Sequence, residues 1–152
     1  MFYKMIENKC KEWYSSDQCT VRNLIEYIEK TGQMRDAQIE AIKVYLFLKT
    51  VCECKPLEFL FRFGCFNSIN LNDIELSTAT REYLEENPAA TALFEYSRLT
   101  NDKGEQVSEK LEKQIKKDPS SIDYDAFFRT AFYGVSYTDY LFSLPMGAGK
   151  TY

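Results

Sequence analysis

Two glycines, a lysine and a threonine near residue 150 have the spacing of a phosphate-binding loop. Gly147 and Gly149 carry no Cβ, so their backbone can adopt positive φ and turn N–H groups toward phosphate oxygens. Lys150 would reach the β- and γ-phosphates, and the Thr151 hydroxyl would ligate Mg²⁺. The spacing therefore predicts binding of ATP and Mg²⁺ by Gly147, Ala148, Gly149, Lys150 and Thr151. Lys150 and Thr151 are the predicted catalytic residues, and Thr151 is the predicted metal ligand.

The residues that precede this loop have the composition of a buried strand. The run Tyr137–Leu144 is rich in aromatic and β-branched residues, and such a strand normally belongs to a parallel sheet covered by helices. A phosphate loop also opens a helix, but the few residues after Gly149 cannot nucleate one. We therefore expect residues 137–152 to be the first strand and loop of an incomplete ATPase domain that cannot hydrolyse ATP alone.

Two stretches resemble one family of nucleic-acid motors. The general loop pattern has glycine where this chain has Leu144, and Pro145–Thr151 resembles motif I of superfamily 2 (DEAD/DEAH-like) helicases and translocases, where that glycine is often replaced. Upstream, Met34–Ile42 resembles the hydrophobic-Arg-x-x-Gln-x-x-Ala-Ile stretch of the same group. There the glutamine contacts the adenine edge, so the resemblance assigns nucleotide binding to Gln38 with Arg35 beside it. An amide both donates and accepts, which suits adenine.

The resemblance implies a RecA-like α/β domain and a larger enzyme. Most of the chain lies between Gln38 and Lys150, whereas compact members have a short connection there. Long insertions are more usual in the motor subunits of type III and type I restriction enzymes. The implied function is the N-terminal part of an ATP-dependent DNA helicase or translocase, with DNA bound by regions outside this chain.

An alternative of a different class stays open. Residues 1–136 would then be a helical protein-interaction module, docking a partner protein or subunit and appended to an unrelated P-loop NTPase. An Arg-x-x-Gln pair is also common on a solvated helix face, so Gln38 acquires its predicted role only through the loop downstream.

Composition limits the function further. The chain has 152 residues, 45% of them hydrophobic, and a net charge of −4, which favours a folded domain and disfavours a nucleic-acid grip in this segment. Apolar runs fall far short of the roughly 20 residues of a membrane span, and no leader-like segment opens the chain, so we expect a soluble cytoplasmic protein without a membrane partner. The basic cluster alternates with acids and is expected to form a solvated helix face: Lys110, Lys113, Lys116 and Lys117.

The cysteines are expected to be thiols rather than zinc ligands. Five cysteines without a secretion signal favour the reduced state, and Cys52, Cys54 and Cys65 lack the Cys-x-x-Cys spacing of zinc sites. The chain has no histidine, so hydrolases of the triad type are not expected.

Hydrophobic periodicity predicts a mainly α fold of about eight helices, with the strand before the loop as the only convincing strand. A polar loop at 100–104 is the expected internal boundary. Expected caps are Thr20, Ser77, Asn87 and either Ser121 or Asp123. The helix at 35–54 should be the central, most buried one, and the aromatic set Tyr124, Phe127, Phe128, Phe132 and Tyr133 should be core. The predicted helices span residues 2–14, 21–31, 35–54, 57–65, 78–86, 88–98, 105–117 and 124–132.

Overall fold

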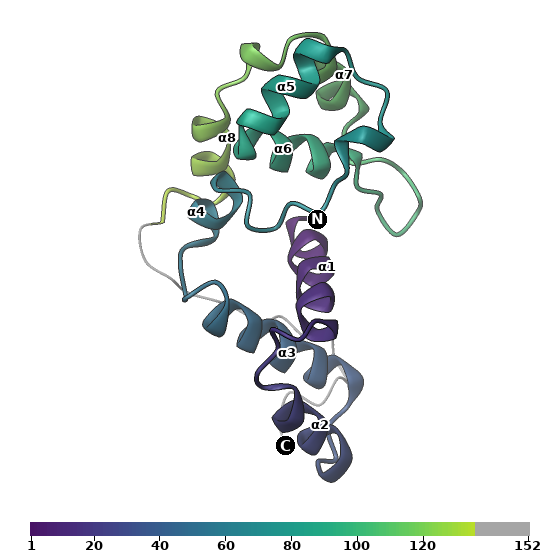
Figure 1. Ribbon diagram of the computed structural model, residues 1–152, viewed down its shortest axis with the longest axis vertical. Helices are drawn as coiled ribbons and strands as arrows, with labels where there is room; N and C mark the ends of the chain where they lie inside the picture. Colours follow the sequence, from purple (N-terminus) through teal and green to yellow (C-terminus); the bar gives the residue numbers. More distant parts are fainter. Residues whose placement is uncertain (136–152) are drawn as a thin grey trace. The chain divides into compact units, whose positions relative to one another are not determined.

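The computed structural model describes residues 1–135 and is mainly helical, as predicted (Figure 1). No strand is assigned within these residues, which hold only one isolated antiparallel bridge, between Thr100 and Gln106. The predicted strand and phosphate loop at 137–152 lie outside the described residues. Within residues 1–135 the α-helices are α1 (Phe2–Ser15), α2 (Arg22–Thr31), α3 (Asp36–Thr50), α4 (Leu57–Arg62), α5 (Thr78–Glu86), α6 (Pro88–Arg98), α7 (Glu109–Lys117) and α8 (Tyr124–Ala131).

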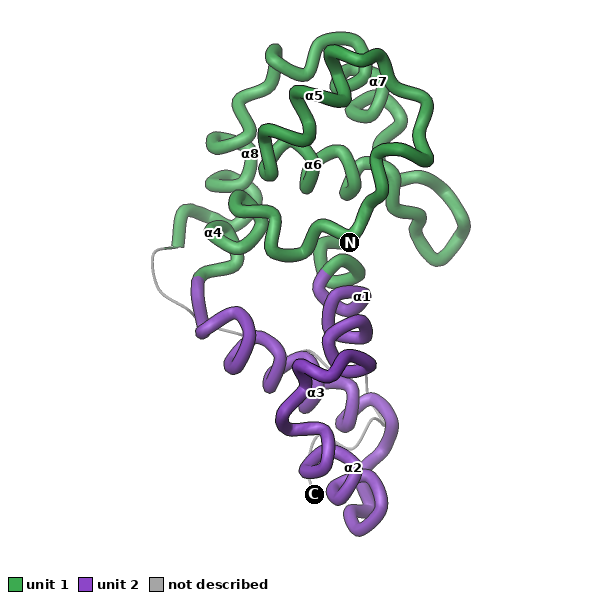
Figure 2. The backbone as a smooth tube through the Cα atoms, in the orientation of Figure 1, with its two compact units in different colours: residues 1–5, 56–137 green, residues 6–55, 138–152 purple. Residues whose placement is uncertain are grey.

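The chain divides into two compact units, drawn in different colours in Figure 2. Of the described residues, unit 1 contains Met1–Met5 and residues 56–135, and unit 2 contains Ile6–Lys55. Residues 100–104 form a loop inside unit 1. Among residues 1–135, no helix combines the length and the apolar character needed to cross a bilayer.

Unit 2 is built from most of α1 with α2 and α3. Its core includes the rings of Trp13 and Phe47, whose centroids lie 5.6 Å apart. Apolar residues from all three helices are buried around them: Ile6, Cys10, Ile25, Ile39, Val44 and Leu48. Burial of this kind supplies most of the stability of short helices, which are marginal in isolation.

The start of α2 differs from the prediction. Thr20 does not cap the helix, because Val21 occupies the cap position and makes no side-chain cap bond. The preceding residues are already held in turns, with the Thr20 N–H donating to the Gln18 carbonyl and the Arg22 N–H to the Cys19 carbonyl. Gly32 follows the last residue of α2, as predicted, although its φ of −82° is one that other residues also adopt.

Helix α3 was wrongly predicted in length and in burial. It ends at Thr50 rather than Cys54 because Glu53 and Cys54 both have positive φ, at 52° and 55°, which a right-handed helix excludes. Helix α3 buries four residues, whereas α6 buries eight. The most buried helix is therefore α6.

Unit 1 is organised around α6, which packs against α4, α5, α7 and α8. Several predicted caps are confirmed: Ser77 accepts from the Thr80 N–H, Asn87 from the Ala90 N–H and Asp123 from the Ala126 N–H. Helix α7 begins four residues later than predicted. The Val107 and Ser108 N–H groups donate instead to the Leu99 and Ser97 carbonyls, at 2.8 and 3.1 Å, which ties this segment to the end of α6.

The predicted aromatic core is confirmed in part. Tyr124 and Phe128 are buried, but Tyr133 is 91% exposed because it lies beyond the end of α8 with a φ of 59°. The Phe128 ring lies near those of Phe2 and Phe61, with centroids 6.1 and 6.0 Å apart.

The basic cluster on α7 is a solvated face with ion pairs, as predicted. Lys113 pairs with Glu109 at 3.2 Å and Lys116 with Glu112 at 2.9 Å. These charges are spaced four residues apart, the spacing at which opposite charges meet on one helix face.

Candidate functional site

The two parts of the predicted ATP site differ in what the structure describes. Gly147, Ala148, Gly149, Lys150 and Thr151 lie outside residues 1–135, so their predicted roles toward phosphate and Mg²⁺ stay predictions. Arg35 and Gln38 are described, and both lie at the start of α3 in unit 2. The described part of the predicted site is therefore the start of α3.

Gln38 closes the first turn of α3 on Arg35. The Arg35 N–H donates to Gln38 Oε1 at 2.8 Å, and the Gln38 N–H donates to the Arg35 carbonyl oxygen at 2.8 Å. Arg35 occupies the cap position, but its side chain carries no acceptor and makes no side-chain cap bond. The Gln38 side chain thus performs half of a capping box.

This capping bond bears on the predicted adenine contact of Gln38. Its Oε1 accepts the bond from the Arg35 N–H. The same bond fixes the orientation of the amide, which lowers the entropy that a ligand must remove when it binds. The Gln38 amide is therefore held in one orientation at the start of α3.

A pocket of about 280 Å³ opens beside this turn. Met34 and Ile39 form its apolar wall; Met34 is 37% exposed and Ile39 is buried. Its polar wall contains three carboxylates and one ammonium group: Glu29, Asp36, Glu40 and Lys43. With three acids against one base, the pocket suits a neutral group rather than a phosphate.

Lys43 is held by carboxylates on two helices. Its Nζ lies 2.9 Å from Glu29 of α2 and 3.3 Å from Glu40 of α3, and 4.6 Å from the centre of the Tyr14 ring. Burial alone would lower the pKa of Lys43, but hydrogen bonds to Glu29 and Glu40 outweigh it and raise the pKa above its ordinary value. The charge of Lys43 thus forms ion pairs that link α2 to α3.

The cysteines show no arrangement for chemistry. All five are thiols, with Cys10, Cys19 and Cys52 buried and Cys54 and Cys65 exposed. Burial, reinforced by Glu40, raises the pKa of Cys10 to about 12, so its reactive thiolate is suppressed. Within residues 1–135, no cluster of acidic, cysteine or histidine side chains is placed to hold a metal ion.

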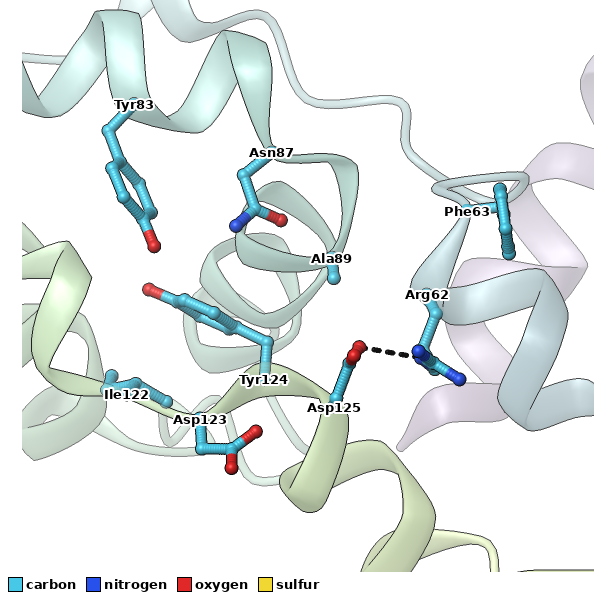
Figure 3. Close-up of a pocket in the computed structure, with 9 residues that line it drawn as sticks. All are labelled: Arg62, Phe63, Tyr83, Asn87, Ala89, Ile122, Asp123, Tyr124 and Asp125. Carbon is cyan, nitrogen blue, oxygen red and sulfur yellow. Dashed lines mark hydrogen bonds and ion pairs between the residues drawn. The ribbon is translucent and has the colours of Figure 1, made fainter.

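A second pocket, of about 400 Å³, lies in unit 1 (Figure 3). Sequence reasoning missed it, because Tyr124 was assigned to the core and Asp123 to a cap. Both assignments are correct, yet the same side chains also border this pocket. Its lining comes from three separate parts of the chain, which no local pattern could combine: Arg62, Phe63, Tyr83, Asn87, Ala89, Ile122, Asp123, Tyr124 and Asp125.

The polar groups of this pocket are fixed by short contacts. The Arg62 guanidinium bonds Asp125 at 2.7 Å, and the Tyr124 hydroxyl donates to the Pro119 carbonyl at 2.6 Å. Burial raises the pKa of Tyr124 above its ordinary value. Figure 3 shows the hydroxyl groups of Tyr83 and Tyr124 turned toward each other, and the ring centroids lie 6.4 Å apart.

The two pockets therefore differ in chemistry: one has an apolar wall beside a positioned amide, and the other has tyrosine rings beside carboxylates. No family model, curated protein or solved structure matches this chain.

Proposed function

We propose that this chain binds ATP and Mg²⁺ as part of an ATP-dependent DNA helicase or translocase. The observation that carries the proposal is the order of two elements along the chain, Arg35-x-x-Gln38 and then Gly147–Thr151. Lys150 and the Mg²⁺ held by Thr151 would neutralise charge that develops on the γ-phosphate, which is the main task in phosphoryl transfer.

The start of α3 supports a role in holding the base. The Gln38 amide is oriented by the Arg35 N–H, and the neighbouring pocket offers the apolar side chains of Met34 and Ile39. The surplus of carboxylates there disfavours phosphate, so the nucleoside end of ATP is the part that suits this pocket. The phosphates are assigned to the glycine-rich loop.

The assignment of DNA to other parts of the protein follows from charge. A net charge of −4 gives this chain no general attraction for a phosphate backbone. On α7, Lys113 and Lys116 are paired with Glu109 and Glu112.

Competition binding with a fluorescent ATP analogue tests the proposal. We expect ATP to displace the analogue better than GTP does, and Lys150→Ala to weaken binding about tenfold or more, because it removes a charge-assisted bond to phosphate. Gln38→Glu keeps an oxygen that can accept from the Arg35 N–H but lacks the amide donor, so the preference for ATP should be lost. Full ATP preference in Gln38→Glu, or undiminished binding in Lys150→Ala, would refute the proposal.

Circular dichroism supplies the control for these variants. Because Gln38→Glu retains the capping acceptor, its melting temperature should stay close to that of the parent chain. Gln38→Ala loses both the cap and the adenine contact, so comparing the two substitutions separates helix stability from base recognition.

A further inference from the structure

Unit 1 carries two exposed aromatic rings on its surface. Phe59 and Phe63 are 38% and 62% exposed, and their rings stack with centroids 4.2 Å apart. Phe59 lies on α4 and Phe63 follows its last residue, and the Phe63 N–H donates to the Phe59 carbonyl, so the two side chains lie on the same side of this turn. Phe63 presents most of its side chain to solvent, and exposed aromatic side chains are common in interaction sites.

The pocket of Figure 3 continues this aromatic surface. Phe63 lines the pocket as well as stacking on Phe59. The rings of Tyr83 and Tyr124 extend the aromatic character inside it, with their centroids 6.4 Å apart. The exposed rings and the pocket therefore form one surface, which we call the α4–α8 surface.

The pocket has an excess of negative charge. Asp123 and Asp125 line it against a single base, Arg62. That guanidinium is already engaged by Asp125 at 2.7 Å and by Glu58 at 3.6 Å. Arg62 is thus matched by acids on both sides, and the carboxylate of Asp123 adds a charge that no base lining the pocket offsets.

We propose that the α4–α8 surface docks a segment of a partner protein that presents an arginine or lysine side chain next to an apolar side chain. The cation would enter the pocket, where carboxylates and tyrosine rings both favour positive charge. The apolar neighbour would pack on Phe59 and Phe63. An aromatic centre with charged groups at its edge is the usual anatomy of a protein interface.

Charge decides between a protein and a nucleic acid as the occupant. A phosphate backbone would meet Asp123 and Asp125, and the chain as a whole carries a net charge of −4. A basic protein segment is instead attracted both by the carboxylates of the pocket and by the negative net charge of the chain. This proposal is independent of the nucleotide proposal, because every residue of the α4–α8 surface belongs to unit 1 and none of them is a predicted nucleotide-binding residue.

Titration of the isotope-labelled chain with a short peptide, followed by NMR, tests the docking site. The probe is acetyl-Leu-Arg-Leu-amide, and acetyl-Leu-Gln-Leu-amide is its uncharged counterpart. We expect the arginine peptide to shift the amide signals of Phe63, Tyr83 and Asn87 with saturation, and the glutamine peptide to bind about tenfold more weakly, since a charge-assisted bond is lost. Equal shifts with both peptides, or no shifts at these residues, would overturn the proposal.

Substitutions make the test specific to the pocket. Asp123→Asn removes the charge while asparagine remains an equally good cap for α8, so binding should weaken about three- to tenfold with the fold intact. Glu109→Gln removes the same charge from the exposed face of α7 and should leave binding unchanged. Phe63→Ser, at a residue that is 62% exposed, should also weaken binding. Full affinity in both Asp123→Asn and Phe63→Ser would contradict the proposal, as would stronger binding of a DNA oligonucleotide at the same signals.

Discussion

Helices α3 and α6 have similar apolar content in the sequence, yet the fold uses them differently. Helix α6 is surrounded by α4, α5, α7 and α8 and buries eight of its residues. Helix α3 buries four, and Tyr45 on its outer side is 42% exposed. The comparison shows that apolar content does not identify the central helix, because burial depends on how many neighbours the chain brings to each side.

The two helices also begin differently. Helix α6 starts with the Asn87 side chain as cap and Pro88 in the first turn. Helix α3 starts at Arg35, which has no acceptor on its side chain, so the Gln38 amide makes the bond instead. Both helix starts lie next to a pocket: Asn87 itself lines the pocket of unit 1, whereas the pocket of unit 2 is lined by Met34 and Asp36, the residues on either side of Arg35.

The largest loss of stability that would test this comparison is expected from a substitution among the buried residues of α6. Phe94 is fully buried, so Phe94→Ala should lower the free energy of unfolding by about 3–5 kcal/mol through lost burial and a cavity. Tyr45→Ala on α3 should cost clearly less, about 1 kcal/mol or below, because 42% of the side chain is exposed and less burial is lost. Urea unfolding followed by circular dichroism measures both. Similar losses in the two variants would show that the outer side of α3 is covered.

A smaller effect is expected at the two helix starts. Asn87→Ala removes a side-chain cap and should cost about 1 kcal/mol. Gln38→Ala should cost less, about 0.5 kcal/mol, because the Gln38 N–H keeps its bond to the Arg35 carbonyl. Amide hydrogen exchange resolves each start separately. A larger loss at Gln38 than at Asn87 would make capping its main role and weaken the case for a nucleobase.

The features predicted correctly are those that a few neighbouring residues decide. The caps Ser77, Asn87 and Asp123 each bond an N–H three residues away, so a local pattern suffices to find them. The late start of α7 was missed because Ser108 is tied to Ser97, a pairing that helical periodicity does not encode.

The candidate sites follow the same rule. Gln38 was assigned through the resemblance of Met34–Ile42 to a family motif, and its nucleotide role stays a prediction. The pocket between Tyr83 and Tyr124 was missed because it forms only when distant parts of the chain meet. The roles of Gly147, Lys150 and Thr151 remain sequence predictions, since these residues lie beyond the described part of the chain.

The smallest expected effect is the dependence of stability on pH. It should differ between the surroundings of α6 and those of α3. Burial alone would raise the pKa of Glu112 on α7, but Lys116, Gln106 and Arg98 outweigh it, so the pKa lies below its ordinary value of 4.5. An acid with a lowered pKa contributes stability above its ordinary pKa and loses that contribution as the pH falls through the folded value. The pKa of Lys43 on α3 is raised, so its contribution is present below pH 10.5 and is lost at more alkaline pH.

Acid should therefore loosen α7 against α6, whereas alkali should loosen α3 against α2. The urea midpoint of the parent chain, measured from pH 6 to pH 3, should fall more steeply than that of Glu112→Gln, which cannot lose a charge. Lys113→Gln, on the exposed side of α7, is the matched control and should follow the parent chain, because its ion pair with Glu109 is open to solvent. Equal slopes for the parent chain and Glu112→Gln would mean that the charge of Glu112 does not stabilise the packing around α6, and the contrast with Lys43 would then rest on α3 alone.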